Sequence, residues 1–354
     1  MNKNLFLLCL IFINYSSYSQ KIEIGEVKKI QSSFLNEARE YWVSLPKHYE
    51  DPNYPDQDYP VIYLLDGEKF FNVVSGIAQN LANDYYPNMP EAIVIGIVNT
   101  NRSRDLTPTH DATLQYNSGG GDTFREFISK ELIPKINADY RVTPLKVLIG
   151  HSFGGLFTMN TVYKTPDLFN RYIAIDPSTW WDNMLIINQT DRILKAKIYS
   201  SNYLYVADAE PTLTHIELDQ QLNKHEAALH LFSEKIKDKK VKGLQIKYEP
   251  YPNEDHGSVF LPALIDGLKM IFNGYKINAK EVVKDPLIME NRYTKLSKKF
   301  GIPIVPQSFY ISNLIDLALK TEEKENAELL YKVIAEHYPN NIFIKTKFIK
   351  GNKE

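Results

Sequence analysis

The sequence contains almost no cysteine. The single one, Cys9, lies in the apolar start of the 354-residue chain. Residues 10–354 therefore offer no thiol for a disulfide, a thiolate metal site or a cysteine nucleophile. Net charge is also nearly absent, since 41 basic residues face 43 acidic ones and the formal net charge is -2. This balance gives no electrostatic reason to expect a nucleic acid or a membrane surface as partner.

The apolar stretch near the N-terminus, residues 5–13, is too short to span a bilayer. It follows the basic Lys3 and precedes Ser17-Tyr18-Ser19, a small-x-small cleavage pattern. This arrangement predicts a signal peptide over residues 1–19, with cleavage before Gln20. A buried first strand is the alternative. Export without disulfides favours a bacterial protein that is periplasmic or secreted.

The rest of the chain alternates short apolar runs with helical patterns, which predicts one large α/β domain over residues 20–280. The strands are expected at residues 22–31, 39–45, 60–65, 92–98, 147–149, 172–175, 203–206 and 244–248. The helices are expected at residues 68–82, 123–136, 156–163, 213–236 and 261–272. Such an alternation is typical of a mostly parallel sheet with helices on both faces, whose ligands bind at the carboxyl ends of the strands.

The pattern changes in residues 281–354. Prolines punctuate a connecting stretch up to residue 306, and residues 309–319 and 326–337 then predict a helical hairpin. Ala327, Tyr331 and Pro339 have the spacing of the second half of a tetratricopeptide repeat, although Ile315 stands where that repeat has glycine. Residues 309–339 could therefore contact a partner protein. The alternative is a pair of helices packed on the main domain.

The most specific pattern is Gly150-His151-Ser152-Phe153-Gly154, which lies between an apolar strand and a helix. A sharp turn from a strand into a helix exposes the serine hydroxyl, and the glycines give the crowded backbone room. Ser152 is therefore the predicted nucleophile, with a structural turn as the alternative. The backbone N–H of Phe153 would be one donor to a developing oxyanion.

A serine nucleophile needs a histidine base and an orienting carboxylate, which in this fold follow the serine in the order acid, then histidine. His256 follows the last predicted strand and is the predicted base, unless it only caps the next helix. Glu210 is the predicted acid because it follows the strand at residues 203–206, and Asp208 is the main alternative. Lesser options for the acid are Asp219 and Asp255.

The second oxyanion donor is expected from the loop after the strand at residues 60–65. There the turn Asp66-Gly67-Glu68 would bring the N–H of Gly67 or Glu68 to the site. One such donor contributes about 3 kcal/mol of transition-state stabilisation. A plain β-turn with no catalytic part is the alternative.

These residues together resemble the esterase branch of the α/β-hydrolase fold that includes enterochelin-type siderophore esterases, feruloyl esterases and S-formylglutathione hydrolase. The pieces that carry the resemblance are residues 60–67, 102–108, 150–155, 175–181 and 255–257, within a region from about 22 to 275. The resemblance implies an α/β-hydrolase domain and a serine carboxylic-ester hydrolase that needs no metal or cofactor. It favours Glu210 as the acid, although Asp208-Ala209 departs from the usual small polar residues.

The resemblance also implies a small-molecule or glycan ester as substrate: a siderophore trilactone, or a feruloyl or acetyl ester on a polysaccharide. Arg102 and Arg104 could bind an anionic or catecholate group, unless they pair with Asp105 to fix their loop. Trp180 and Trp181 could stack on an aromatic acyl group, unless they belong to the core. The rival function is a non-catalytic binding protein that uses its helical C-terminus.

Overall fold

The computed structural model describes residues 22–83, 86–113, 117–210, 220–344 and 346. The expected signal peptide lies outside the described residues, as does Asp219, one of the lesser acid candidates.

The centre of the molecule is an eight-stranded sheet in the order β1-β2-β4-β3-β5-β6-β7-β8. The hairpin of β1 and β2 adds antiparallel strands at one edge, and the strands from β4 to β8 in this order run parallel. The strands are β1 (Glu26–Ser32), β2 (Glu37–Ser44), β3 (Tyr59–Leu64), β4 (Ile93–Ile97), β5 (Val142–His151), β6 (Arg171–Ile175), β7 (Asn202–Glu210) and β8 (Leu244–Pro252). This is the mostly parallel sheet that the sequence predicts.

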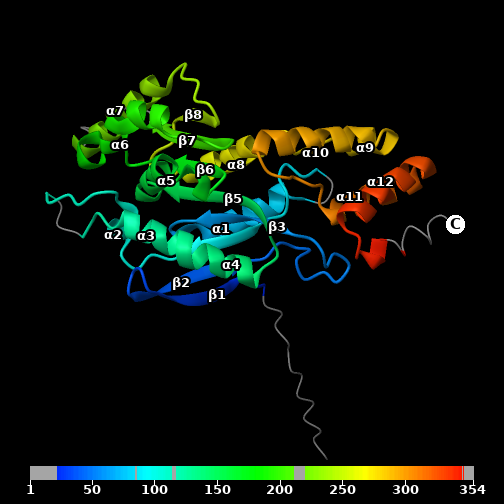
Figure 1. Cartoon of the computed structure of the whole chain (residues 1–354). Coiled ribbons are helices and arrows are strands. Elements are labelled where there is room, and N and C mark those ends of the chain that lie inside the picture. The colour runs from blue at the N-terminus through cyan, green and yellow to red at the C-terminus, as the bar shows by residue number, and fades with distance from the viewer. Residues whose placement is uncertain (1–21, 84–85, 114–116, 211–219, 345, 347–354) are drawn as a thin grey trace, which may run out of the picture.

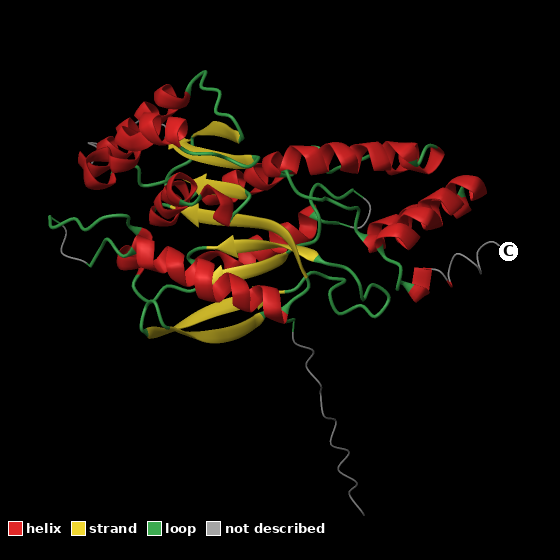
Figure 2. Cartoon of the chain, in the orientation of Figure 1, coloured by secondary structure: helices red, strands yellow, loops and turns green. Residues whose placement is uncertain are grey.

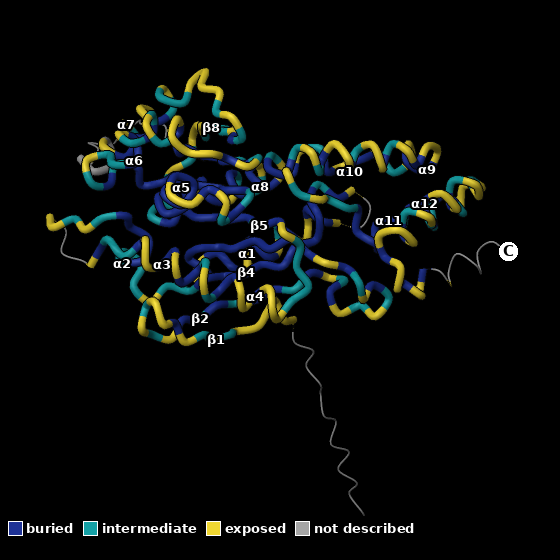
Figure 3. Tube along the Cα trace, in the orientation of Figure 1, coloured by how far each residue is buried: buried dark blue, intermediate teal, exposed yellow. Residues whose placement is uncertain are grey.

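Both faces of the sheet are covered, because every residue of β3, β4 and β6 is buried. Alternate residues of a strand enter two separate apolar cores: Ile62 and Leu64 face one, and Val61 and Tyr63 the other. The first core is covered by α1 (Gly67–Leu81) and α8 (Phe260–Ile271). The second is covered by α3 (Gly121–Phe127), η1 (Ile128–Leu132), α4 (Ile133–Asp139), α5 (Phe153–Lys164), α6 (Trp181–Ala196) and α7 (Gln220–Ile236). The sheet therefore lies between two helical layers (Figure 3).

The C-terminal part is entirely helical. The predicted hairpin is present as α11 (Ser308–Lys320) and α12 (Lys324–His337), while the expected connecting stretch itself contains α9 (Ala279–Lys284) and α10 (Leu287–Phe300). Buried residues of all four helices belong to the same apolar core as α1 and α8. Ser308 N also donates to Gln57 Oε1 at 2.7 Å, which ties the hairpin to the main domain. A tetratricopeptide character of this hairpin stays a prediction.

The helical extension lies away from the carboxyl ends of the parallel strands. In Figure 2 the strand arrows point toward one end of the sheet, and α9–α12 project from the opposite end (Figure 1). The residues with candidate chemistry follow the arrowheads, so the extension does not cover them.

Among the described helices, none combines the length and the apolar character that crossing a bilayer requires.

Candidate active site

Ser152 occupies the corner between β5 and α5. Its backbone has φ 60° and ψ -118°, a left-handed conformation that is strained for a residue with a Cβ. The neighbouring strand holds it there, since Ser152 N donates to Ile175 O at 3.0 Å and Ser178 N donates to Ser152 O at 3.1 Å. This is the strained strand-to-helix turn that the sequence predicts.

The glycines around Ser152 are required by close packing. A Cβ on Gly150 would lie 2.2 Å from Gly154 O, and one on Gly155 would lie 2.9 Å from the backbone of Pro177. Either contact would force the corner open. The flanking glycines therefore let α5 begin directly after Ser152, with Phe153 as its first residue. Leu156 N donates to Ser152 O in the first turn of this helix.

His256 lies in the loop after β8, and its ring is oriented by a buried carboxylate. Its Nδ1 is hydrogen-bonded to Oδ2 of Asp176, which follows β6 directly. The Ser152 hydroxyl lies 3.3 Å from Ser178 Oγ. Because Nδ1 is engaged, Nε2 is the ring nitrogen left to interact with a hydroxyl.

Asp176 is held as a carboxylate in spite of its burial. It is fully buried, which raises its pKa, but the adjacent imidazoles of His225 and His256 outweigh burial and hold the pKa well below its usual range. Ala209 N also donates to its Oδ1 at 3.2 Å. His225, from α7, brings its Nε2 to 3.0 Å from Oδ2. Asp176 therefore stays ionised at neutral pH.

The two carboxylates that the sequence favoured do not make this contact. Strand β7 continues to Glu210, four residues past its predicted end, so Glu210 is an exposed strand residue rather than part of a turn. Asp208 is buried and accepts a hydrogen bond from the Tyr248 hydroxyl. Burial raises the pKa of Asp208 to about 7, although the Tyr248 bond lowers it. A group that is half protonated at neutral pH is a poor orienting carboxylate.

We expect Asp208→Asn to stabilise the fold, and more at high pH than at low pH. The folded pKa of about 7 exceeds the unfolded value of about 3.9, so the native carboxyl destabilises the fold increasingly as pH rises from about 4 to 7. Removing the charge should add up to about 4 kcal/mol at pH 8.5 and much less near pH 4. Thermal unfolding at both pH values measures this, with the exposed Asp167→Asn as the control. An equal gain at both pH values would contradict it.

His151 fixes the backbone of His256. The two rings lie 4.5 Å apart, and His151 Nε2 lies 2.8 Å from the carbonyl oxygen of His256. Burial, together with the nearby His256, lowers the pKa of His151 to about 4. His151 is therefore neutral at pH 7, with its proton on Nε2 because that nitrogen faces a carbonyl acceptor.

The predicted oxyanion turn lies beside the Ser152 corner. Asp66 has a left-handed φ of 55°, and Gly67 and Glu68 are the first residues of α1, where N–H groups have no partner within the helix. Gly67 is required, because a Cβ there would lie 2.6 Å from the Gly96 backbone. Arg102 joins this turn to the corner: its Nε donates to Asp66 Oδ1 at 2.6 Å and its Nη2 to His151 O at 3.2 Å.

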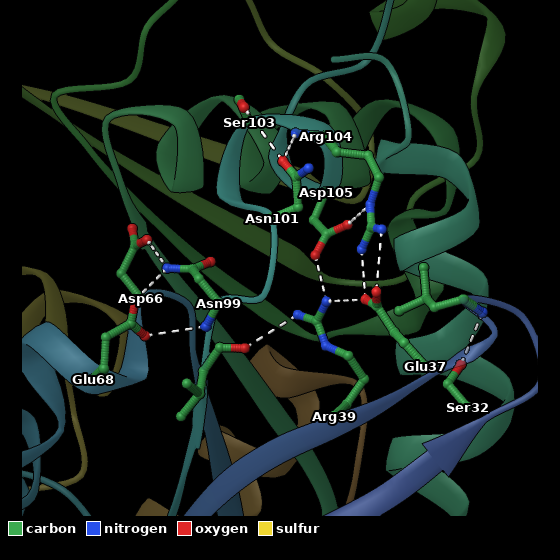
Figure 4. Close-up of polar contacts among 12 residues, drawn as sticks. Ser32, Glu37, Arg39, Asp66, Glu68, Asn99, Asn101, Ser103, Arg104 and Asp105 are labelled. Atoms are coloured by element: carbon green, nitrogen blue, oxygen red, sulfur yellow. Dashed lines mark hydrogen bonds and ion pairs between the residues drawn. The ribbon is translucent and has the colours of Figure 1, made fainter. Parts of the chain in front are cut away.

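A side-chain amide also braces the turn. Asn99 Nδ2 donates to Asp66 Oδ1 at 2.7 Å and to Glu68 Oε1 at 2.6 Å, as Figure 4 shows. Asn99 and Arg102 thus both bind Asp66. The orientation of the backbone of Gly67 and Glu68 therefore depends on side chains that follow β4.

Arg104 is part of a structural ion-pair network. Its Nη2 lies 2.6 Å from Glu37 Oε1, and its Nε 2.7 Å from Asp105 Oδ1 (Figure 4). Buried Arg39 completes the network at 2.5 Å from Asp105. The alternative in which an arginine fixes its loop therefore describes Arg104. Arg102 is also paired, with Asp66, but it is partly exposed and its guanidinium lies over the Phe153 ring.

The two tryptophans differ in burial. Trp181 is fully buried, and its Nε1 donates to Thr109 Oγ1 at 3.1 Å, so it belongs to the core. Trp180 is half-buried, and its ring centroid lies 6.2 Å from that of Phe153, the residue after Ser152. Trp180 is thus the tryptophan whose position suits contact with a bound acyl group.

Asp176 and His225 were not among the residues singled out from the sequence. Asp176 had a readable signal: it directly follows the strand next to the one that carries Ser152. His225 had no such signal, because it lies within a polar helical pattern. Only the position of that helix against the sheet brings it next to Asp176.

Comparison with known proteins identifies the family of this chain. Residues 32–267 match the family described as Putative esterase. The chain is 30% identical over 261 residues to a siderophore triacetylfusarinine C esterase of Aspergillus fumigatus, covering 66% of this chain and 88% of the relative. It is 29% identical over 259 residues to the ferri-bacillibactin esterase BesA of Bacillus subtilis, covering 68% of this chain and 86% of the relative.

A solved structure is similar over nearly the whole chain. The IroE-like serine hydrolase from Shewanella oneidensis superposes with a TM-score of 0.79 at 31% identity, covering 87% of this chain and 98% of that one. The predicted α/β-hydrolase fold and the predicted class of enzyme are thereby confirmed. The chain belongs to the Putative esterase family and is an ester hydrolase.

Proposed function

We propose that this protein is an exported serine esterase that hydrolyses siderophore esters, with Ser152 as nucleophile and His256 as base. The observation that carries the proposal is the strained Ser152 corner at the same end of the sheet as the His256–Asp176 pair. Relatives whose names specify siderophore esters support the substrate class.

The first step is attack by Ser152 on the ester carbonyl. His256 Nε2 takes the hydroxyl proton as the new C–O bond forms. Asp176, ionised and bound to Nδ1, keeps the proton of the neutral ring on Nδ1 and stabilises the imidazolium that forms. Ser152 Oγ must turn from Ser178 to His256 for this step, an adjustment that free enzymes commonly make when substrate binds.

The tetrahedral intermediate places negative charge on the former carbonyl oxygen. We assign its stabilisation to the backbone N–H of Phe153 and that of Gly67 or Glu68, at the starts of α5 and α1, where the helix dipoles favour an anion. His256 then protonates the leaving alcohol. Water, activated by the same ring, releases the acyl group through a second tetrahedral intermediate.

The site is suited to an aromatic, anionic acyl group. Trp180 offers a half-buried ring near Ser152, and the guanidinium of Arg102, partly exposed although paired with Asp66, lies over Phe153. A catecholate ester of a siderophore has both features, and a feruloyl ester has the ring without the second phenolate. Export rests on the N-terminal pattern, and contact with a protein partner through residues 309–339 is a separate proposal.

The test is hydrolysis of a catecholate trilactone by the chain from Gln20, beside feruloyl and acetyl esters. We expect the trilactone to have the highest kcat/KM and a fluorophosphonate to label Ser152, located by peptide mass. Preference for the feruloyl ester would instead indicate that the substrate is a feruloylated polysaccharide. No turnover and no label would reject the serine mechanism and favour the binding-protein function.

A further inference from the structure

Three metal-binding side chains meet behind the candidate base. Asp176 follows β6, His225 lies on α7 and His256 follows β8, and one ligand atom from each lies within 4.8 Å of the others. The carboxylate Oδ2 lies 3.0 Å from His225 Nε2 and is hydrogen-bonded to His256 Nδ1. The two imidazole rings are nearly perpendicular, at 83°. Their nitrogens therefore approach the carboxylate from different directions.

His225 is not one of the three side chains that a Ser-His-Asp arrangement requires. It is 8% exposed, and its buried Nε2 lies 3.0 Å from Asp176 Oδ2 without making a hydrogen bond. Buried polar atoms in native structures are nearly always paired, so such an atom in a cluster of metal-ligand types points to a ligand.

We propose that Asp176, His225 and His256 bind one zinc-class transition metal ion, and that this ion reversibly inhibits the esterase. Two imidazoles and one carboxylate suit Zn²⁺ or Co²⁺, whereas Mg²⁺ and Ca²⁺ prefer all-oxygen sites. Tetrahedral zinc with bonds of about 2.0 Å places its ligand atoms about 3.3 Å apart, so small side-chain shifts form the site. The side chain of His256 is 43% exposed and leaves the cluster open to solvent, which supplies a water as fourth ligand.

The inhibition follows from the tautomer of His256, and this step rests on the proposed function. A metal bound to His256 Nδ1 replaces the proton that this nitrogen otherwise carries and donates in its hydrogen bond to Asp176. The neutral ring then carries its proton on Nε2, the nitrogen that has to accept the Ser152 proton. The metal-bound enzyme therefore has no general base, although Ser152 is untouched. Removing the metal restores the Nδ1–H tautomer and the bond to Asp176.

The test is a titration of the tag-free, metal-free chain with Co²⁺, followed by visible absorption, and competition by Zn²⁺. We expect one Co²⁺ per chain with the intense bands of a low-symmetry nitrogen–oxygen site. His225→Gln should weaken binding at least about tenfold, while His230→Gln, an exposed histidine on the same helix, should leave it unchanged. Equal binding by wild type and His225→Gln would overturn the proposal. His225→Leu repeats the comparison if the glutamine variant does not fold.

Ester turnover separates this inference from the proposed function. Zinc should inhibit ester turnover by the wild type, and EDTA should reverse the inhibition. His225→Gln should need at least about tenfold more zinc for half inhibition, with each protein compared with its own zinc-free rate. Turnover without Co²⁺ binding would reject the metal site alone. Co²⁺ binding by a chain that hydrolyses no ester would reject the proposed function and leave the metal site standing.

Discussion

Ser152→Ala is expected to lower kcat on p-nitrophenyl esters by at least about a thousandfold, and His256→Ala by a similar factor. Alanine removes the atom that forms the acyl-enzyme in the first case and the proton acceptor in the second. Because the two side chains act as one unit, the double variant should be no slower than either single one. Steady-state turnover of the chain from Gln20 measures all three.

Ser178→Ala is the matched control for Ser152→Ala. Its Oγ lies 3.3 Å from Ser152 Oγ, yet its own backbone does not have the strained conformation of Ser152. We expect its kcat to stay within about tenfold of wild type. If Ser178→Ala loses activity and Ser152→Ala keeps it, the assignment of Ser152 as the nucleophile is wrong.

The fold could be predicted because its strands are marked by continuous apolar runs. β3 and residues 147–149 of β5 are buried on both faces and form continuous apolar runs, so periodicity is not needed to find them. Ser152 and its glycines were readable for a similar reason: the corner tolerates few residue types. The helix α6 was missed, since its sequence alternates polar and apolar residues irregularly and its first turn has left-handed backbone at residues 182–184.

The sequence did not single out Asp176 as the partner of His256, because three carboxylates lie at the ends of two neighbouring strands. The resemblance and the predicted end of the strand at residue 206 favoured Glu210, but the position of that side chain depends on how far β7 extends. Pairing of β7 with β8 continues to Glu210 opposite Pro252, which keeps Asp208 and Glu210 within the strand. Asp176 is one strand nearer to Ser152, and its left-handed backbone, φ 42°, could not be inferred from residue type.

Asp176→Asn should therefore have the second largest effect, a fall in kcat of about a thousandfold to ten-thousandfold. Asparagine keeps the shape of the side chain, but its amide can present an N–H to His256 Nδ1. That would favour the tautomer whose Nε2 carries the proton and cannot accept one from Ser152. The charge that stabilises the imidazolium is lost as well. KM should change little, because Asp176 lies buried behind the ring and does not face the substrate.

Glu210→Gln provides the matched comparison, with the same change of carboxylate to amide on an exposed side chain. It should keep kcat within about tenfold of wild type. If Glu210→Gln loses activity and Asp176→Asn keeps it, then Glu210, the acid predicted from the sequence, is the correct one. The contact of Asp176 with His256 would then belong to a resting arrangement that changes when substrate binds. If both variants lose activity, the two carboxylates act in succession on His256. Only selective loss in Asp176→Asn assigns the orienting role to the carboxylate that the fold places against Nδ1.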